Sequence, residues 1–115
     1  MAQNFEGKTV LVTGGGSGIG RAAACAFANA GAKVMISDID DTGANETVGL
    51  IESGSGTAAY VRTDMSRATE VEALVGETLA RFGRLDCAFN NAGIQGALCP
   101  TAECSEENWD AITKV

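Results

Sequence analysis

The chain has 115 residues, of which 45% are hydrophobic, and its fifteen acidic and eight basic side chains give a net charge of −7. This length allows one domain at most and is enough to bury a core. The negative charge excludes electrostatic attraction to nucleic acid or anionic lipid as the basis of its function.

The first half of the chain predicts two strand-helix units. Residues 8–13 (KTVLVT) form a β-branched run that ends in glycines, and residues 18–30 predict a helix of small residues that Gly31 terminates. Residues 33–37 (KVMIS) predict a second strand, and residues 42–51 predict a weaker helix before a stretch of serine and glycine.

The second half continues the alternation. Residues 57–62 (TAAYVR) predict a third strand, and residues 68–82 predict a helix that Gly83 caps. This helix places five apolar side chains on one expected face: Val71, Leu74, Val75, Leu79 and Phe82. Residues 85–90 (LDCAFN) predict a fourth strand, and Ser105 is a suitable N-cap for a further helix.

Short apolar strands that alternate with helices predict an α/β fold, a doubly wound parallel sheet with strand order 3-2-1-4. The fourth strand would form an apolar edge, which favours pairing with another strand or self-association. The helix that begins near residue 105 still shows its apolar spacing at Val115. We therefore expect residues 1–115 to be one domain portion, incomplete at its C-terminus and ending within a helix.

A glycine-rich turn, TGGGSGIG at residues 13–20, joins the first strand to the first helix. The N-terminus of a helix attracts anions, and glycine allows a pyrophosphate to approach the backbone closely. A flexible turn without a ligand is the alternative. A P-loop is excluded because Arg21 and Ala22 stand where the lysine and hydroxyl of that motif belong.

Asp38 follows the second predicted strand, where a carboxylate can accept hydrogen bonds from the ribose hydroxyls of a dinucleotide. NADP carries a phosphate at this ribose, and its repulsion by Asp38 would amount to several kcal/mol without an intervening cation. Gly16 and Ile39 supply none. This position therefore predicts NAD, and a solvated turn or cap aspartate is the alternative.

These segments together resemble the classical short-chain dehydrogenase/reductases. The resemblance rests on TGGGSGIG, on Asp38, on residues 62–65 (RTDM) and on residues 90–93 (NNAG), in the order and spacing of that family. It covers essentially the whole chain and implies a Rossmann-type fold that binds NAD.

Carried over by position, the resemblance implies a set of cofactor-binding residues. Those of the glycine turn would line the pyrophosphate: Gly14, Ser17, Gly18, Ile19 and Gly20. Those after the second and third strands would meet the adenosine: Asp38, Ile39, Asp64 and Met65. Those after the fourth strand would pass under the adenine ribose: Asn91, Ala92 and Gly93. For Asp64 and Asn91 a local turn-forming role is the alternative.

The family's catalytic groups are a tyrosine, a lysine four residues later, a serine and an asparagine, and no segment of this sequence matches them. Tyr60, the one tyrosine, lies in the third predicted strand with Asp64 four residues later, so we expect a packed strand residue. The resemblance implies an oxidoreductase that moves a hydride between NAD(H) and an alcohol or ketone, a homo-oligomer when complete. The 115 residues alone are expected to be inactive.

Two other classes of function stay open. A dinucleotide-sensing or protein-binding module could keep the fold without the chemistry. An enzyme that uses a nucleotide sugar or S-adenosylmethionine on a similar sheet matches the glycine spacing and the NNAG segment poorly.

The four cysteines form no CxxC pair, and the chain has no histidine, so we expect neither structural zinc nor a disulfide framework. Cys25 and Cys87 lie in apolar stretches and are expected to be small core residues.

No apolar run approaches the roughly 20 residues of a membrane span. The first residues also lack the order of a signal peptide. We therefore expect a cytoplasmic protein.

Overall fold

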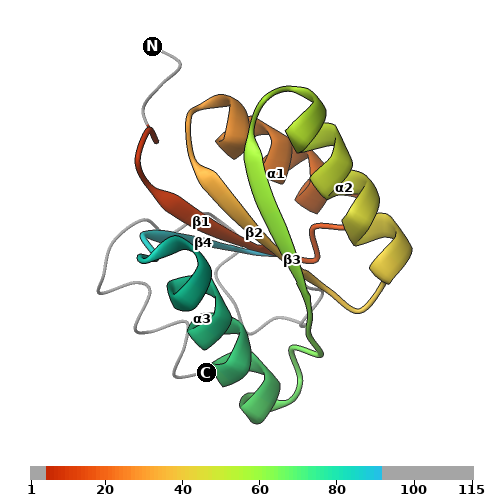
Figure 1. The fold of residues 1–115 in the computed structure, drawn as a ribbon. Coiled ribbons are helices and arrows are strands. Elements are labelled where there is room, and N and C mark those ends of the chain that lie inside the picture. Colours follow the sequence, from red (N-terminus) through yellow and green to blue (C-terminus); the bar gives the residue numbers. More distant parts are fainter. Residues whose placement is uncertain (1–4, 92–115) are drawn as a thin grey trace.

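The computed structural model describes residues 5–91, which form a four-stranded parallel sheet flanked by three helices (Figure 1). In chain order the elements are β1 Thr9–Thr13, α1 Gly18–Asn29, β2 Lys33–Asp38, α2 Asp41–Ser53, β3 Thr57–Arg62, α3 Ala68–Phe82 and β4 Cys87–Asn90. The strands lie in the order β3-β2-β1-β4 and all pairs are parallel. The α/β class and the strand order predicted from the sequence are confirmed.

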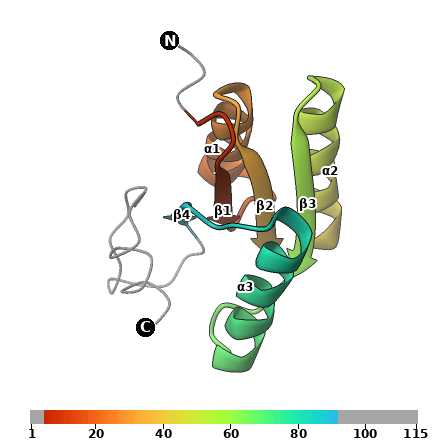
Figure 2. The same ribbon diagram turned by 60° about the vertical axis from the view of Figure 1, so that its left-hand side comes forward.

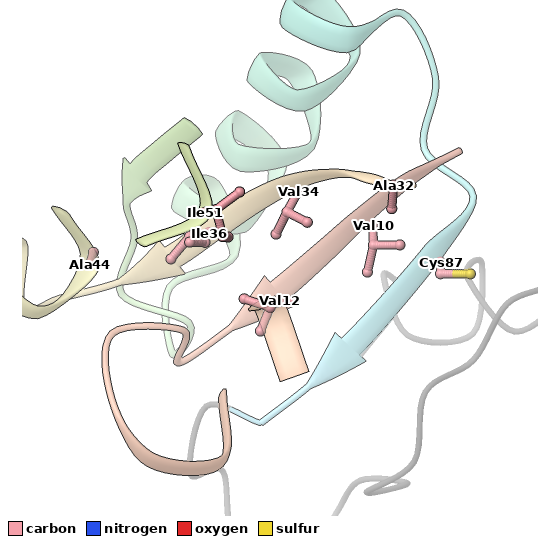
Figure 3. Close-up of a cluster of buried hydrophobic side chains, with 9 residues drawn as sticks. Val10, Val12, Ala32, Val34, Ile36, Ala44, Ile51 and Cys87 are labelled. Atoms are coloured by element: carbon pink, nitrogen blue, oxygen red, sulfur yellow. The ribbon is translucent and has the colours of Figure 1, made fainter. Parts of the chain in front are cut away.

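Both faces of the sheet are covered, α1 and α2 on one side and α3 on the other (Figure 2). Successive side chains of a strand point to opposite faces. Val10 and Val12 of β1 therefore enter the core cluster beneath α1 and α2 (Figure 3), and Leu11 enters the cluster beneath α3. This two-sided burial explains why the strands are apolar runs rather than alternating ones.

The helix α3 has the predicted bounds, and Gly83 ends it in the left-handed conformation with φ of 81°. Its buried side chains are Leu74 and Thr78, whereas Leu79 is 46% exposed. The expectation that Leu79 belongs to the inward face is therefore wrong. Thr78 takes the inward position one turn after Leu74, and its hydroxyl is satisfied by the Leu74 carbonyl at 2.8 Å.

The register brings the carboxyl ends of the strands to one edge of the sheet. Thr13 at the end of β1 pairs with Ser37 of β2 on one side and with Asn90 of β4 on the other. The chain winds outward from β1 through β2 to β3 and then crosses to β4. The ends of β1 and β4 therefore form a topological switch point, the usual ligand crevice of such sheets.

The two cysteines within residues 5–91 differ in their chemistry. Cys25 of α1 is a partly buried free thiol packed on the first core cluster, as expected. Cys87 of β4 is fully buried in the same cluster, but it is disulfide-bonded, which corrects the expectation of a core residue without a disulfide.

Asp86 anchors the start of β4 to the start of β1. Its backbone N–H donates to the Thr9 carbonyl at 2.9 Å, and its carboxylate accepts from the Thr9 N–H at 2.8 Å. Arg84 donates two further hydrogen bonds to the same carboxylate, at 2.7 and 2.8 Å. Burial opposes ionisation of Asp86, but the hydrogen bonds outweigh it and lower the pKa of this carboxyl.

This lowered pKa predicts a pH-dependent stability. A carboxylate with a lower pKa in the folded state stabilises above its unfolded pKa of about 3.9, and that contribution is lost as the pH falls through the folded value. We expect Asp86→Asn to lower the free energy of unfolding at pH 7 by about 2 kcal/mol and to flatten its decline in acid. Urea titrations from pH 3 to 7 measure both. Glu52→Gln, at an exposed carboxylate of α2, is the control, and an equal acid slope in both variants would contradict the role of Asp86.

Candidate functional site

A cleft of about 820 Å³ opens at the carboxyl edge of the sheet. Residues at or shortly after the ends of all four strands line it: Gly14, Ser17, Gly18, Ile19, Ser37, Asp38, Ile39, Thr63, Asp64, Met65, Ser66 and Asn91. It lies at the switch point between β1 and β4 and extends across the ends of β2 and β3.

The glycine turn between β1 and α1 forms one wall. Gly14 adopts a left-handed conformation with φ of 67°, and its N–H donates to the Ser37 carbonyl at 2.7 Å. A Cβ on Gly20 would lie 2.0 Å from the Gly14 carbonyl oxygen, so the first turn of α1 packs directly on the loop. The N-terminus of α1, with its free N–H groups, therefore borders the cleft and suits an anion.

Asp38 forms the second wall at the end of β2. Its Oδ2 accepts a hydrogen bond from the Gly16 N–H at 2.8 Å, and its Oδ1 accepts from the Asp40 N–H at 3.0 Å. A Cβ on Gly16 would lie 2.7 Å from Oδ2, so a side chain at position 16 would displace this carboxylate. The two backbone donors fix the orientation of Asp38 and leave each oxygen a further lone pair for a ligand hydroxyl.

The third wall follows β3. The Asp64 carboxylate accepts hydrogen bonds from the Ser66 hydroxyl at 2.6 Å and from the Ser66 N–H at 2.9 Å, and these bonds lower its pKa. The Asp64 N–H donates to Glu70 Oε1 at 2.7 Å, and the Ser37 hydroxyl lies 3.6 Å from the sulfur of Met65. The structure thus shows the turn-forming role of Asp64, while its role toward a ligand stays a prediction.

The fourth wall is the segment after β4. The Asn91 N–H donates to the Thr13 hydroxyl oxygen at 2.7 Å, and that hydroxyl lies 3.1 Å from the Asn90 side-chain oxygen. Thr13 at the end of β1 thereby holds the start of this segment against the glycine turn. No sequence pattern marks Thr13 as a site residue, because its role depends on this contact with a segment 78 residues further along the chain.

The cleft brings together most of the residues implied by the resemblance. Those that line it are Gly14, Ser17, Gly18, Ile19, Asp38, Ile39, Asp64, Met65 and Asn91. Gly20 is buried behind the loop, where it allows close packing instead of facing the cleft. Ala92 and Gly93 lie outside the described residues. Three hydroxyl residues that were not predicted as site residues also line the cleft, although each stands at or shortly after the end of a predicted strand: Ser37, Thr63 and Ser66.

Tyr60 is not among the residues that line the cleft, and its hydroxyl is engaged elsewhere. It packs on the first core cluster, and its hydroxyl donates to Asp41 Oδ1 at 2.5 Å and lies 3.1 Å from the Asp38 carbonyl oxygen. Burial, together with the hydrogen bond to Asp41, raises the pKa of this phenol above its usual value. Tyr60 is therefore the packed strand residue that we expected, and it is poorly suited to proton transfer at neutral pH.

The walls differ in their chemistry. The helix N-terminus favours an anion, and Asp38 accepts hydrogen bonds from hydroxyl groups. Ile19 and Ile39, both lining the cleft, are 71% and 61% exposed and offer apolar surfaces to a flat ring. This arrangement of walls suits a ligand with a diphosphate, a sugar diol and a ring system.

Residues 5–91 contain neither a cluster of metal-binding side chains nor a helix long and apolar enough to cross a membrane.

Comparison with known proteins identifies close relatives. The model of the short chain dehydrogenase family matches residues 8–115. A 2,5-dichloro-2,5-cyclohexadiene-1,4-diol dehydrogenase of Sphingobium indicum is 49% identical over 106 residues, which are 92% of this chain and 41% of that protein. The chain thus spans about two fifths of the length of this relative.

Solved structures agree with the sequence relatives. A hydroxysteroid dehydrogenase from Escherichia coli superposes with a TM-score of 0.78 at 38% identity, covering 83% of this chain and 40% of that one. A short chain dehydrogenase/reductase from Burkholderia phymatum, solved in complex with NAD, superposes with a TM-score of 0.70 at 36% identity, covering 71% of this chain and 29% of that one.

Proposed function

The chain belongs to the short-chain dehydrogenase family, and on this basis we propose that residues 1–115 are the NAD-binding portion of an oxidoreductase that acts on an alcohol or carbonyl substrate. When bound, the dinucleotide would supply the hydride acceptor or donor. The described part of the chain would bind and orient it.

The observation that carries this proposal is the position of Asp38. Its carboxylate is fixed by the Gly16 N–H at the wall of the cleft, beside the N-terminus of α1. An adenosine ribose placed there would donate its 2′ and 3′ hydroxyls to the carboxylate while the diphosphate lies at the helix N-terminus. One nucleotide therefore satisfies both polar walls of the cleft.

The charges around Asp38 favour NAD over NADP. At about 4 Å and an effective dielectric near 20, a unit charge pair costs about 4 kcal/mol, so a ribose phosphate beside Asp38 would be repelled. Two arginines on neighbouring elements could screen this repulsion, but each has an acidic partner. A terminal nitrogen of Arg21 lies 3.0 Å from Glu46 Oε1, and Arg62 Nε lies 3.7 Å from Asp41 Oδ1.

The roles of the individual residues follow the walls of the cleft. Those proposed to contact the diphosphate are Gly14, Ser17, Gly18 and Ile19, with Gly20 as the packing residue behind them. Those proposed to contact the adenosine are Asp38, Ile39, Asp64 and Met65. Those proposed to pass under the ribose are Asn91, Ala92 and Gly93.

Two of the relatives named above are a diol dehydrogenase and a hydroxysteroid dehydrogenase, which supports an alcohol or ketone as the substrate class. The tyrosine and lysine that the family uses for proton transfer have no counterpart in these 115 residues. We therefore expect a polypeptide of residues 1–115 to bind the cofactor without turning over an alcohol.

Fluorescence titration of the protein with NADH and NADPH tests the proposal. We expect NADH to bind at least about tenfold more tightly, a difference of about 1.4 kcal/mol. Absence of NADH binding at millimolar concentration would contradict the proposed function. Alcohol-dependent formation of NADH by residues 1–115 alone would contradict the proposed division between cofactor binding and proton transfer.

A further inference from the structure

Arg21 stands at an unexpected place for a cation. It lies in the first turn of α1, where the helix dipole disfavours positive charge and where an anionic ligand would be the obvious partner. Its guanidinium is instead directed at backbone carbonyls on the α2 side. One terminal nitrogen lies 2.7 Å from the Gly16 carbonyl oxygen and 3.1 Å from that of Gly43. The same nitrogen lies 3.0 Å from Glu46 Oε1.

A second donor nitrogen of Arg21, Nε, reaches the glycine turn through Thr47. Nε donates to the Thr47 hydroxyl oxygen at 2.9 Å, and that hydroxyl donates to the Gly15 carbonyl at 2.7 Å. Thr47 is fully buried in α2, so these partners are shielded from water. Arg21 and Thr47 therefore hold two consecutive carbonyl groups of the glycine turn.

The first of these peptides is fixed at both ends. Within one planar trans peptide, the carbonyl and the following N–H point in opposite directions. The Gly15 carbonyl is held by Thr47, and the Gly16 N–H of the same peptide donates to Asp38 Oδ2 at 2.8 Å. The hydroxyl of Thr47 and the carboxylate of Asp38 thus orient this peptide together.

The next peptide is oriented in the same way. Arg21 holds the Gly16 carbonyl on the α2 side, so the N–H of Ser17 points to the opposite side. Ser17 lines the cleft at the N-terminus of α1, where an anion would accept this N–H. The close fit of α2 leaves little room for adjustment, since a Cβ on Gly43 would lie 2.6 Å from the Gly16 oxygen.

We propose that Arg21 and Thr47 are positioning residues for the diphosphate: they contact no phosphate themselves but orient two consecutive peptides of the glycine turn, so that the Ser17 N–H faces the diphosphate. This inference rests on the proposed binding of a dinucleotide. It assigns to Arg21 a role that its charge and sequence position would not suggest, because a cation beside a phosphate site is usually a direct ligand.

Binding of ADP and adenosine to the full chain separates these roles, since ADP carries the diphosphate and adenosine does not. We expect Arg21→Met and Thr47→Val to weaken ADP binding about tenfold, the equivalent of one lost buried hydrogen bond. Adenosine binding should change by less than about twofold. Thr47→Ser keeps the hydroxyl and should restore ADP binding. Asn45→Ala, at an exposed position of α2, is the matched control.

The other outcomes overturn the inference in distinguishable ways. If the unmodified chain binds neither ADP nor NADH, the proposed function fails. If it binds ADP and the Arg21 and Thr47 variants bind ADP equally well, the positioning role fails. A parallel loss of adenosine binding would indicate general damage to the fold and would also contradict it. If Arg21→Met markedly flattens the dependence of ADP affinity on salt, Arg21 is a direct phosphate ligand instead.

Discussion

Replacement of Gly20 by alanine is expected to abolish NADH binding and to lower the free energy of unfolding by about 3 kcal/mol. The added Cβ would lie 2.0 Å from the Gly14 carbonyl oxygen and 2.8 Å from its carbon. Both atoms are backbone, so no rotamer change relieves the overlap. Either α1 or the glycine turn must move, and each movement displaces the helix N-terminus from the cleft.

Urea denaturation and NADH titration of the same sample measure the two effects. Gly49→Ala is the control, because Gly49 is an exposed position of α2 and nothing lies within 4 Å of an added Cβ. That substitution should raise the free energy of unfolding by up to about 1 kcal/mol, since alanine favours the helix. If Gly20→Ala bound NADH as tightly as the unmodified chain, the close packing of α1 on the loop would not matter for binding.

The fold could be predicted from the sequence because its patterns are local and strong. Strand β3 and helix α3 have the predicted bounds, and Gly31 and Gly83 adopt the left-handed conformation expected of residues that end a helix. The helix α2 was predicted less well: it extends from Asp41 to Ser53, beyond the predicted residues 42–51. Its contacts with the glycine turn and β3 stabilise a helix whose own sequence is a weak helix former.

The inward face of α3 shows where periodicity fails. Leu79 fits the apolar spacing, yet Thr78 is the buried side chain because its hydroxyl can bond to the Leu74 carbonyl within the helix. A polar residue can be buried in a core when its side chain forms a hydrogen bond within its own helix. The spacing of apolar residues alone does not predict such a position.

Some residues of the candidate site could likewise be predicted from the sequence, and others could not. Residues at the ends of strands could be predicted, because parallel topology brings all four ends to one edge. Thr13 and Thr47 could not, since their roles depend on contacts between elements far apart in the chain. The Thr13 hydroxyl meets the Asn91 N–H, and the Thr47 hydroxyl meets the Gly15 carbonyl. No local pattern marks either contact.

Asp38→Asn should reverse the choice between the two nicotinamide dinucleotides while keeping the contact with the glycine turn. The asparagine oxygen can still accept the hydrogen bond of the Gly16 N–H, whereas the negative charge and the hydrogen bond from the Asp40 N–H are lost. We expect the ratio of NADH to NADPH affinity to fall about a hundredfold, or about 2.7 kcal/mol. This is less than the full Coulomb repulsion of about 4 kcal/mol because the cleft is open to solvent.

Asp40→Asn makes the same change in net charge two residues further on, at an exposed position, and serves as the control for Asp38→Asn. Titration of each variant with both nucleotides gives the affinity ratio directly. A large change in Asp38→Asn alone would mean that this carboxylate meets the ribose. An equal, small change in both variants would mean that Asp38 only accepts the N–H groups of Gly16 and Asp40, as a turn-forming aspartate does, and that the selectivity for NAD arises elsewhere.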